Sequence, residues 1–153
     1  MLRAAICDDE VVILSTMKSS IEKTFLQEKF DCSIQAFSSG EELLKSHKTQ
    51  PYDILFLDIY MTGCSGFDVA KTIGKLTPNT LLIFVTSQDS MVYNSLDYRP
   101  FQFVRKSRIQ KDNSELVTVT RKLIKYYREH KSITLYLGVG ENRCVSFQEI
   151  LYL

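Results

Sequence analysis

The chain lacks any long hydrophobic run. Its longest uninterrupted aliphatic or aromatic stretch is Leu81–Val85, far short of the roughly 20 residues that a membrane-spanning helix needs. The first residues become acidic at Asp8, where a secretory signal would require an apolar centre, so export is not indicated. The sequence therefore predicts a cytoplasmic protein.

Metal-ligating and disulfide-forming residues are also sparse. The four cysteines form no C-x-x-C pair and only two histidines accompany them, which disfavours a zinc site and a disulfide framework. His47 and His130 are isolated near expected helix ends, where a solvated or helix-terminal histidine is the simplest interpretation. With 44% hydrophobic and 24% charged residues in 153, the chain is typical of a globular domain with an appendage.

The charges are unevenly distributed along the chain. Residues 99–131 contain ten Lys or Arg and three Asp or Glu, whereas residues 1–98 contain eight and thirteen. The basic stretch could face nucleic acid or an acidic partner, but charge alone favours a solvated helix face.

Strand-like and helix-like patterns alternate along the chain. Short apolar runs predict five strands, at Ala4–Cys7, Ser33–Phe37, Ile54–Leu57, Leu81–Val85 and Phe101–Val104. Apolar residues at three- and four-residue spacing predict helices between them, with a weak helix at 90–96 and a long one at 113–130. The alternation predicts an α/β fold with a doubly wound, five-stranded parallel sheet.

The residues that terminate the expected strands are chemically distinctive. Asp8-Asp9, Asp58, Thr86 and Lys106 each follow or end a strand, and the working site of such a sheet lies beyond the carboxyl ends of its strands. Three converging carboxylates would repel each other, so they need cations, which Mg²⁺ and Lys106 would supply.

Within this cluster we expect Asp9 and Asp58 to bind the metal directly and Asp8 to act through water. A carboxylate beside Mg²⁺, an ammonium group and the Thr86 hydroxyl is equipped to accept a phosphoryl group, which makes Asp58 the candidate nucleophile. Taken singly, Asp8 or Asp9 could merely cap the first helix and Lys106 could be a surface charge, but their joint placement favours the phosphoacceptor interpretation.

Four segments of the chain resemble a response-regulator receiver domain over about residues 2–130. They are Ile6-Cys-Asp-Asp-Glu10, Leu57-Asp-Ile-Tyr-Met-Thr-Gly-Cys-Ser-Gly66, Val85-Thr-Ser87 and Phe103-Val-Arg-Lys106. The resemblance implies a flavodoxin-like sheet of strand order 2-1-3-4-5. It also implies the site residues: Asp58 as phosphoacceptor, Asp8, Asp9, Asp58 and the Tyr60 carbonyl as ligands of Mg²⁺ or Mn²⁺, Thr86, Lys106 and Phe103 as phosphate-binding and switch residues, and Tyr60 and Gln88 as residues that tune the phosphoryl lifetime.

The same resemblance implies the partners. A sensor histidine kinase would be the phosphodonor, and the receiver would promote its own phosphorylation without being a turnover enzyme. Phosphorylation would remodel the fourth helix, fifth strand and fifth helix, the face on which receivers form homodimers.

The chain departs from the family pattern at two positions, where Thr62 and Ser107 replace the usual prolines. Because a cis bond before a non-proline residue costs about 3 kcal/mol, we expect a trans peptide between Lys106 and Ser107. Neither replacement removes a reacting group.

Residues 131–153 change in pattern. Two or three short strands are expected from residue 133 onward, separated by a Gly/Asn turn, and this short β tail resembles the start of a DNA-binding domain of the LytTR (LytR/AlgR/AgrA-like) family. The resemblance implies a receiver at residues 1–130, including a long fifth helix, then a linker and a truncated start of the DNA-binding domain. The chain is thus expected to be a fragment of a transcription regulator that reaches DNA through the parent's C-terminal domain.

Four alternatives remain at this stage. A stand-alone or degenerate receiver acting through protein contacts shares the fold. A Mg²⁺-dependent aspartyl-phosphate phosphatase is disfavoured because its D-x-D pattern would need an aspartate at Tyr60, and a flavin-binding flavodoxin because the acidic Asp8–Glu10 segment would repel a phosphate. A redox sensor that uses Cys64 is the fourth.

Overall fold

The computed structural model describes residues 1–87, 96–109 and 115–137, the last seven as helical backbone only. Its strands are β1 (Leu2–Cys7), β2 (Cys32–Phe37), β3 (Ile54–Asp58), β4 (Leu81–Thr86) and β5 (Gln102–Arg105). All neighbouring strands pair in parallel, in the order β2-β1-β3-β4-β5. The predicted fold and strand order are confirmed.

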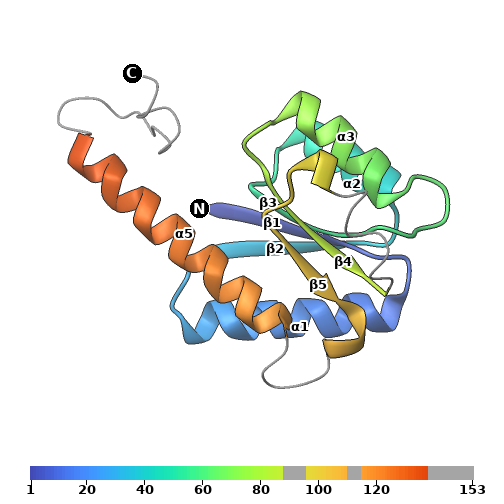
Figure 1. The fold of residues 1–153 in the computed structure, drawn as a ribbon, viewed down its shortest axis with the longest axis horizontal. Helices are drawn as coiled ribbons and strands as arrows, with labels where there is room; N and C mark the ends of the chain where they lie inside the picture. The colour runs from blue at the N-terminus through green and yellow to red at the C-terminus, as the bar shows by residue number, and fades with distance from the viewer. Residues whose placement is uncertain (88–95, 110–114, 138–153) are drawn as a thin grey trace.

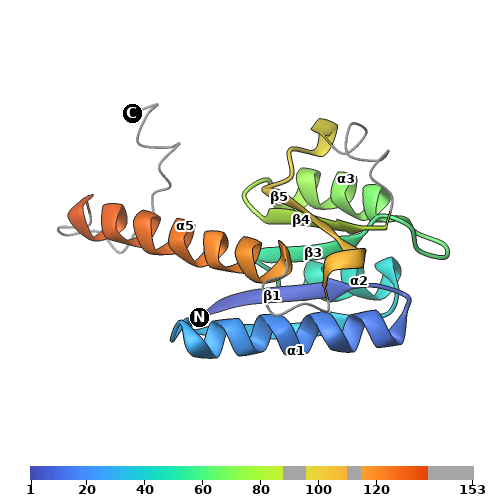
Figure 2. The same cartoon turned by 60° about the horizontal axis from the view of Figure 1, so that its bottom comes forward.

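Helices cover both faces of the sheet (Figures 1 and 2). The helices described are α1 (Val11–Gln27), α2 (Gly40–Thr49), α3 (Gly66–Leu76) and α5 (Glu115–Leu137). Figure 2 shows α1 and α5 against one face and α2 and α3 against the other. Along β3, Ile54 and Phe56 pack in the α1–α5 core, whereas Leu55 and Leu57 pack in the α2–α3 core. Every residue of β3 is buried, as a central parallel strand requires.

Local capping fixes where α2 and α3 begin. The Ser39 side chain accepts a hydrogen bond from the Glu42 N–H, and Glu41 and Glu42 stand in the first turn of α2. Ser65 and Asp68 form a capping box at the start of α3. The first turn of α3 therefore begins right after the loop that follows β3, which brings that loop close to the sheet edge.

The C-terminal part of α5 contradicts the predicted β tail. Residues 133–137, expected to form a strand, continue α5 to Leu137. A helix satisfies its backbone hydrogen bonds within itself, whereas a strand needs a neighbouring strand. Figure 1 shows α5 extending beyond the sheet. The rest of the expected β tail, residues 138–153, lies outside the described residues, and so does most of the expected helix at 90–96, of which Leu96 begins the short 3₁₀ helix η2 (Leu96–Tyr98).

In the part of the chain that the structure describes, no helix has the length and hydrophobicity needed to cross a membrane.

Candidate functional site

The carboxyl ends of β1 and β3 bring two buried carboxylates together. Cys7 pairs with Leu57 in the parallel ladder, so Asp8, directly after β1, lies beside Asp58, the last residue of β3. Their exposed fractions are 0% and 2%, whereas Asp9 is exposed. Carboxylate oxygens of Asp8, Asp9 and Asp58 all lie within 4.8 Å of one another. The predicted acidic cluster therefore forms.

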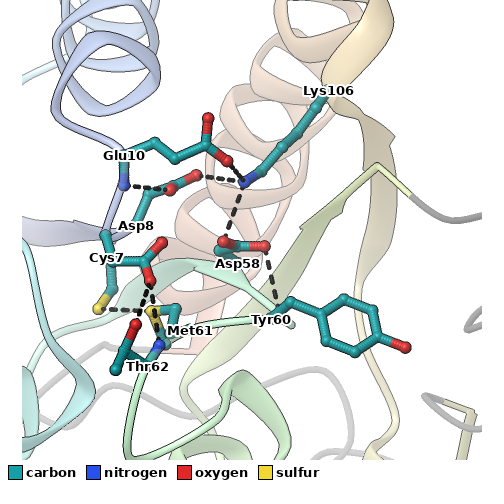
Figure 3. Close-up of polar contacts among 9 residues, drawn as sticks. Cys7, Asp8, Glu10, Asp58, Tyr60, Met61, Thr62 and Lys106 are labelled. Atoms are coloured by element: carbon teal, nitrogen blue, oxygen red, sulfur yellow. Dashed lines mark hydrogen bonds and ion pairs between the residues drawn. The ribbon is translucent and has the colours of Figure 1, made fainter.

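Lys106 supplies the cation of this cluster (Figure 3). It is the first residue of the 3₁₀ helix η3 (Lys106–Arg108), directly after β5. Its Nζ lies 2.9 Å from Asp8 Oδ2 and 2.9 Å from Asp58 Oδ2. It also lies 3.3 Å from Glu10 Oε1. The site thus gathers one ammonium group with three carboxylates that touch it.

Burial and charge set the ionisation of these groups. Burial raises the pKa of Asp58 to about 6, although the hydrogen bond from Lys106 works in the opposite direction. Burial also works to lower the pKa of Lys106, but its hydrogen bonds with Asp58 and Asp8 and the negative charges of those carboxylates together outweigh burial and raise it. Asp58 is therefore ionised above about pH 6, next to a lysine that stays charged.

The donor set fits a hard divalent cation. Asp8 Oδ2 is buried, and its partner among the described residues is the Lys106 ammonium, 2.9 Å away. The carboxylates outnumber the single lysine, so the site keeps an excess of negative charge and free oxygen lone pairs. Asp8, Asp9 and Asp58 would hold such a cation, as Mg²⁺ prefers carboxylate oxygens.

The N-cap residue of α1 is Glu10, without a side-chain cap hydrogen bond, so the helix-capping role considered for Asp8 is not seen. Asp8 makes a different local contact. Its Oδ1 accepts a hydrogen bond of 2.9 Å from the Glu10 N–H, at the N-cap of α1. The same carboxylate therefore orients the start of α1 with one oxygen and contacts Lys106 with the other.

The backbone after Asp58 folds tightly against the strand. Gly66 donates its N–H to the Ile59 carbonyl at 2.9 Å, and a Cβ at Gly66 would lie 2.2 Å from the Asp58 carbonyl oxygen. Gly63 has a φ of +79°, a conformation that glycine adopts without strain. The loop 59–65 can therefore return to α3 directly beside the acidic cluster.

Tyr60 stands at the start of this loop. Its N–H donates to Asp58 Oδ1 at 3.3 Å, and the residue is 45% exposed. Figure 3 shows the ring pointing away from Asp58 and Lys106. The two roles expected for Tyr60, as a carbonyl ligand and as a residue that tunes phosphoryl lifetime, stay predictions.

The remaining expected switch residues lie on β4 and β5. Thr86 is the buried last residue of β4, one position beyond Val85, which pairs with Asp58. Phe103 on β5 packs against Phe84, with ring centroids 5.9 Å apart. Gln88 lies outside the described residues.

The structure also answers two smaller questions. Among the described residues no peptide bond is cis, so the bond between Lys106 and Ser107 is trans, as predicted. Burial raises the pKa of the Cys64 thiol, so this cysteine lacks the low-pKa thiolate that a redox sensor needs.

Two site residues were missed from the sequence. Glu10 pairs with Lys106, and the only available signal was its place directly after Asp8-Asp9. Thr62 donates both its N–H and its hydroxyl to Asp9 Oδ2, at 3.0 and 3.1 Å. Thr62 stood out in the sequence only as a departure from the family pattern.

Comparison with known proteins agrees with this geometry. The chain is 26% identical to the sensory transduction protein LytT of Bacillus subtilis over 99% of its own length and 64% of that protein. It is 28% identical to the sensory transduction protein LytR of Staphylococcus epidermidis over 90% of its length and 59% of that protein. The chain thus spans about three fifths of the length of these curated relatives.

Solved structures show the same fold. The response regulator TrrA of Thermotoga maritima, solved in complex with Mg(2+)-BeF, matches 82% of this chain and 98% of its own with a TM-score of 0.64 and 28% identity. A two component transcriptional regulator AraC from Clostridium phytofermentans matches 86% of this chain and 98% of its own, with a TM-score of 0.69 and 23% identity. The family model for the response regulator receiver domain matches residues 4–120. The chain therefore belongs to the response regulator receiver domain family, with the sensory transduction proteins LytT and LytR among its relatives.

Proposed function

We propose that this chain is the phosphorylation-dependent input domain of a two-component response regulator. Asp58 is the proposed phosphoacceptor, and the donor is the phosphohistidine of a sensor histidine kinase. The observation that carries the proposal is the convergence of Asp8, Asp9, Asp58 and Lys106 at one edge of a receiver fold.

In the proposed reaction a carboxylate oxygen of Asp58 forms a bond to phosphorus. The bond between phosphorus and the donor imidazole nitrogen breaks, and its electron pair leaves with the nitrogen. Asp58 suits this role because its pKa of about 6 leaves it ionised at neutral pH. Lys106 Nζ, 2.9 Å from Asp58 Oδ2, is close enough to pair with the transferred phosphoryl oxygens.

A bound metal ion would complete the site. Asp8, Asp9, Asp58 and the Tyr60 carbonyl are the proposed ligands of Mg²⁺, or of Mn²⁺ in its place. When bound, the ion would offset the negative charge of the carboxylates and of the phosphoryl oxygens. The buried position of Asp8 and Asp58 keeps water from screening that attraction.

Phosphorylation is proposed to switch a surface through charge. An aspartyl phosphate adds roughly −1.5 to −2 units of charge, toward which the Thr86 hydroxyl and the Lys106 ammonium are drawn. The Phe103 ring, packed on Phe84, then moves and changes the face of the fourth helix, β5 and α5. That face is proposed to form a homodimer on activation, and Tyr60 and Gln88 are proposed to set the lifetime of the phosphoryl group.

The output is proposed to be transcription regulation. Residues 1–130 would form the receiver, and residues 131–153 would lead into a LytTR-type DNA-binding domain, since the LytT and LytR relatives are longer than this chain. We also propose that the protein is cytoplasmic. We assign it no turnover activity, because its phosphorylated aspartate is the signal itself.

Incubation with acetyl phosphate and Mg²⁺, followed by intact mass measurement, tests the chemistry. One phosphoryl group, stable in acid and labile in base, is expected on the parent chain and is expected to be absent from Asp58→Asn. Asp31→Asn, a change at an exposed aspartate before β2, is the matched control and should be labelled like the parent. Labelling of Asp58→Asn, or no labelling of the parent, would contradict the proposal and favour a receiver that acts through protein contacts alone.

A further inference from the structure

The orientation of Asp9 depends on a single residue. Asp9 Oδ2 accepts the Thr62 N–H at 3.0 Å and the Thr62 hydroxyl at 3.1 Å, bonds that are dashed at Thr62 in Figure 3. These are the only hydrogen bonds or ion pairs of Asp9 among the described residues. Asp8 and Asp58, in contrast, are each held by Lys106 and by a backbone N–H.

The loop that carries Thr62 is anchored without Asp9. On one side of Thr62, the Cys7 thiol donates to Met61 Sδ at 3.4 Å. On the other side, the Cys64 N–H donates to Glu41 Oε1 of α2 at 2.9 Å, and the Gly66 N–H donates to Ile59 O at 2.9 Å. Thr62 is therefore fixed by its own loop, and the exposed Asp9 carboxylate adopts the orientation that Thr62 imposes.

Both donors of Thr62 go to the same oxygen of Asp9. The second oxygen remains available for a cation, and Asp9 offers one carboxylate oxygen within 4.8 Å of oxygens on Asp8 and Asp58. An aspartate at an exposed position otherwise samples several rotamers, and each must be given up when a metal binds. Hydrogen bonds that hold a ligand in its binding rotamer raise metal affinity.

We propose that Thr62 is a positioning residue for the divalent cation site, holding Asp9 in its ligating orientation through paired N–H and hydroxyl donors. The inference rests on the proposed function, since it requires that Asp9 be a metal ligand. The loop after β3 then takes part in metal binding, because the Thr62 hydroxyl sets part of the affinity for the ion.

Isothermal titration of the full chain with Mg²⁺, in the absence of any phosphodonor, tests the proposal. Thr62→Val keeps the N–H and loses the hydroxyl, and we expect its dissociation constant to rise about threefold to tenfold. Thr62→Ser keeps both donors and should bind within about twofold of the parent. Thermal unfolding in the presence of a chelator should be the same for all three chains, because Thr62 is exposed and the hydrogen bond of its hydroxyl among the described residues goes to Asp9.

Asp9→Asn separates failure of the inference from failure of the metal site. If Asp9→Asn binds Mg²⁺ as the parent does, the proposed metal site itself is wrong. If Asp9→Asn weakens binding but Thr62→Val binds like the parent, only the role of Thr62 is overturned. In the Asp9→Asn background, Thr62→Val is expected to have no further effect, and a second independent loss there would also refute the positioning role.

Discussion

Lys106 Nζ lies 2.9 Å from Asp58 Oδ2, and this contact spans the sheet from the turn after β5 to the end of β3. The lysine reaches past β4, which lies between those strands, and its ammonium also meets Asp8 beyond the end of β1. One cation therefore balances two buried carboxylates from two strands. A change in the charge of Lys106, Asp8 or Asp58 therefore alters the environment of the other two, so the stability of the fold and the chemistry of the site are linked.

Removal of the lysine charge should destabilise the fold. With Lys106→Met, two buried carboxylates lose their cation, and we expect the free energy of unfolding at pH 7.5 to fall by about 2–4 kcal/mol. Denaturant unfolding in a chelator measures the loss, and added Mg²⁺ should recover part of it because the ion supplies the missing positive charge. Lys122→Met, at an exposed position on α5, is the control. An equal loss in both variants would count against a charge effect.

Removal of one carboxylate should have the opposite effect. Because the folded-state pKa of Asp58 is raised to about 6, its ionisation at higher pH costs folding stability. Asp58→Asn leaves Lys106 paired with Asp8, so the free energy of unfolding at pH 7.5 should rise by about 1–2 kcal/mol.

The gain from Asp58→Asn should depend on pH in a defined direction. A raised pKa means that the stability contribution of Asp58 is fully present below its unfolded-state pKa, about 4, and is lost as the pH rises through about 6. The difference between variant and parent should therefore be largest above pH 7 and vanish near pH 4. Denaturant unfolding at both pH values checks it, and a gain that does not change with pH would rule out ionisation as the cause.

Gly66 and Gly74, both in α3, offer a matched pair of substitutions. A Cβ at Gly66 would lie 2.2 Å from the Asp58 carbonyl oxygen, whereas a Cβ at Gly74 would meet nothing within 4 Å. Gly66→Ala should force the loop away from β3 and lower the free energy of unfolding by about 2 kcal/mol or more. Gly74→Ala should raise it by about 0.5–1 kcal/mol, because alanine favours the helix. Thermal melts of both variants measure these changes in stability. A change of the same sign in both variants would argue against the close approach of Gly66 to the Asp58 carbonyl.

The parts of the site that could be predicted from sequence are those fixed by strand ends. The carboxyl ends of parallel strands meet at one edge of the sheet, so the proximity of Asp8, Asp58 and Lys106 can be predicted once the strands are located. The contacts of Glu10 and Thr62 could not be derived, since they depend on how far a loop folds back and on which side-chain rotamer reaches across it.

Residues 133–137 show the limit of pattern reading for secondary structure. Ile133 to Leu137 is a short apolar run with β-branched residues, which fits a strand or a continued helix equally well. In the structure the preceding helix continues through it.

His47 shows a similar limit for burial. It stands near the end of α2, as expected, but its exposed fraction is 1%, because Tyr52 from the following loop and Thr77 at the end of α3 pack around it.

That burial of His47 predicts a loss of stability in mild acid. His47 Nδ1 accepts the Tyr52 N–H at 3.2 Å, so its proton sits on Nε2, which lies 2.8 Å from Thr77 Oγ1. Burial, and then the Arg3 charge, lower the pKa of His47. A second proton would have to displace the Tyr52 N–H, so the folded state resists protonation.

The stability that neutral His47 contributes is complete above its unfolded-state pKa of about 6.5 and is lost as the pH falls below that value. Between pH 7 and 5 the parent should therefore lose stability through this residue. His47→Gln cannot take up a proton, so its free energy of unfolding should fall less steeply over the same interval, even if it starts lower. His130→Gln, the same change at the half-buried histidine of α5, should retain the parent's slope. Urea titrations at pH 7, 6 and 5 on the three chains give the slopes directly, and identical slopes for the parent and His47→Gln would show that the buried histidine is not the group that senses the acid.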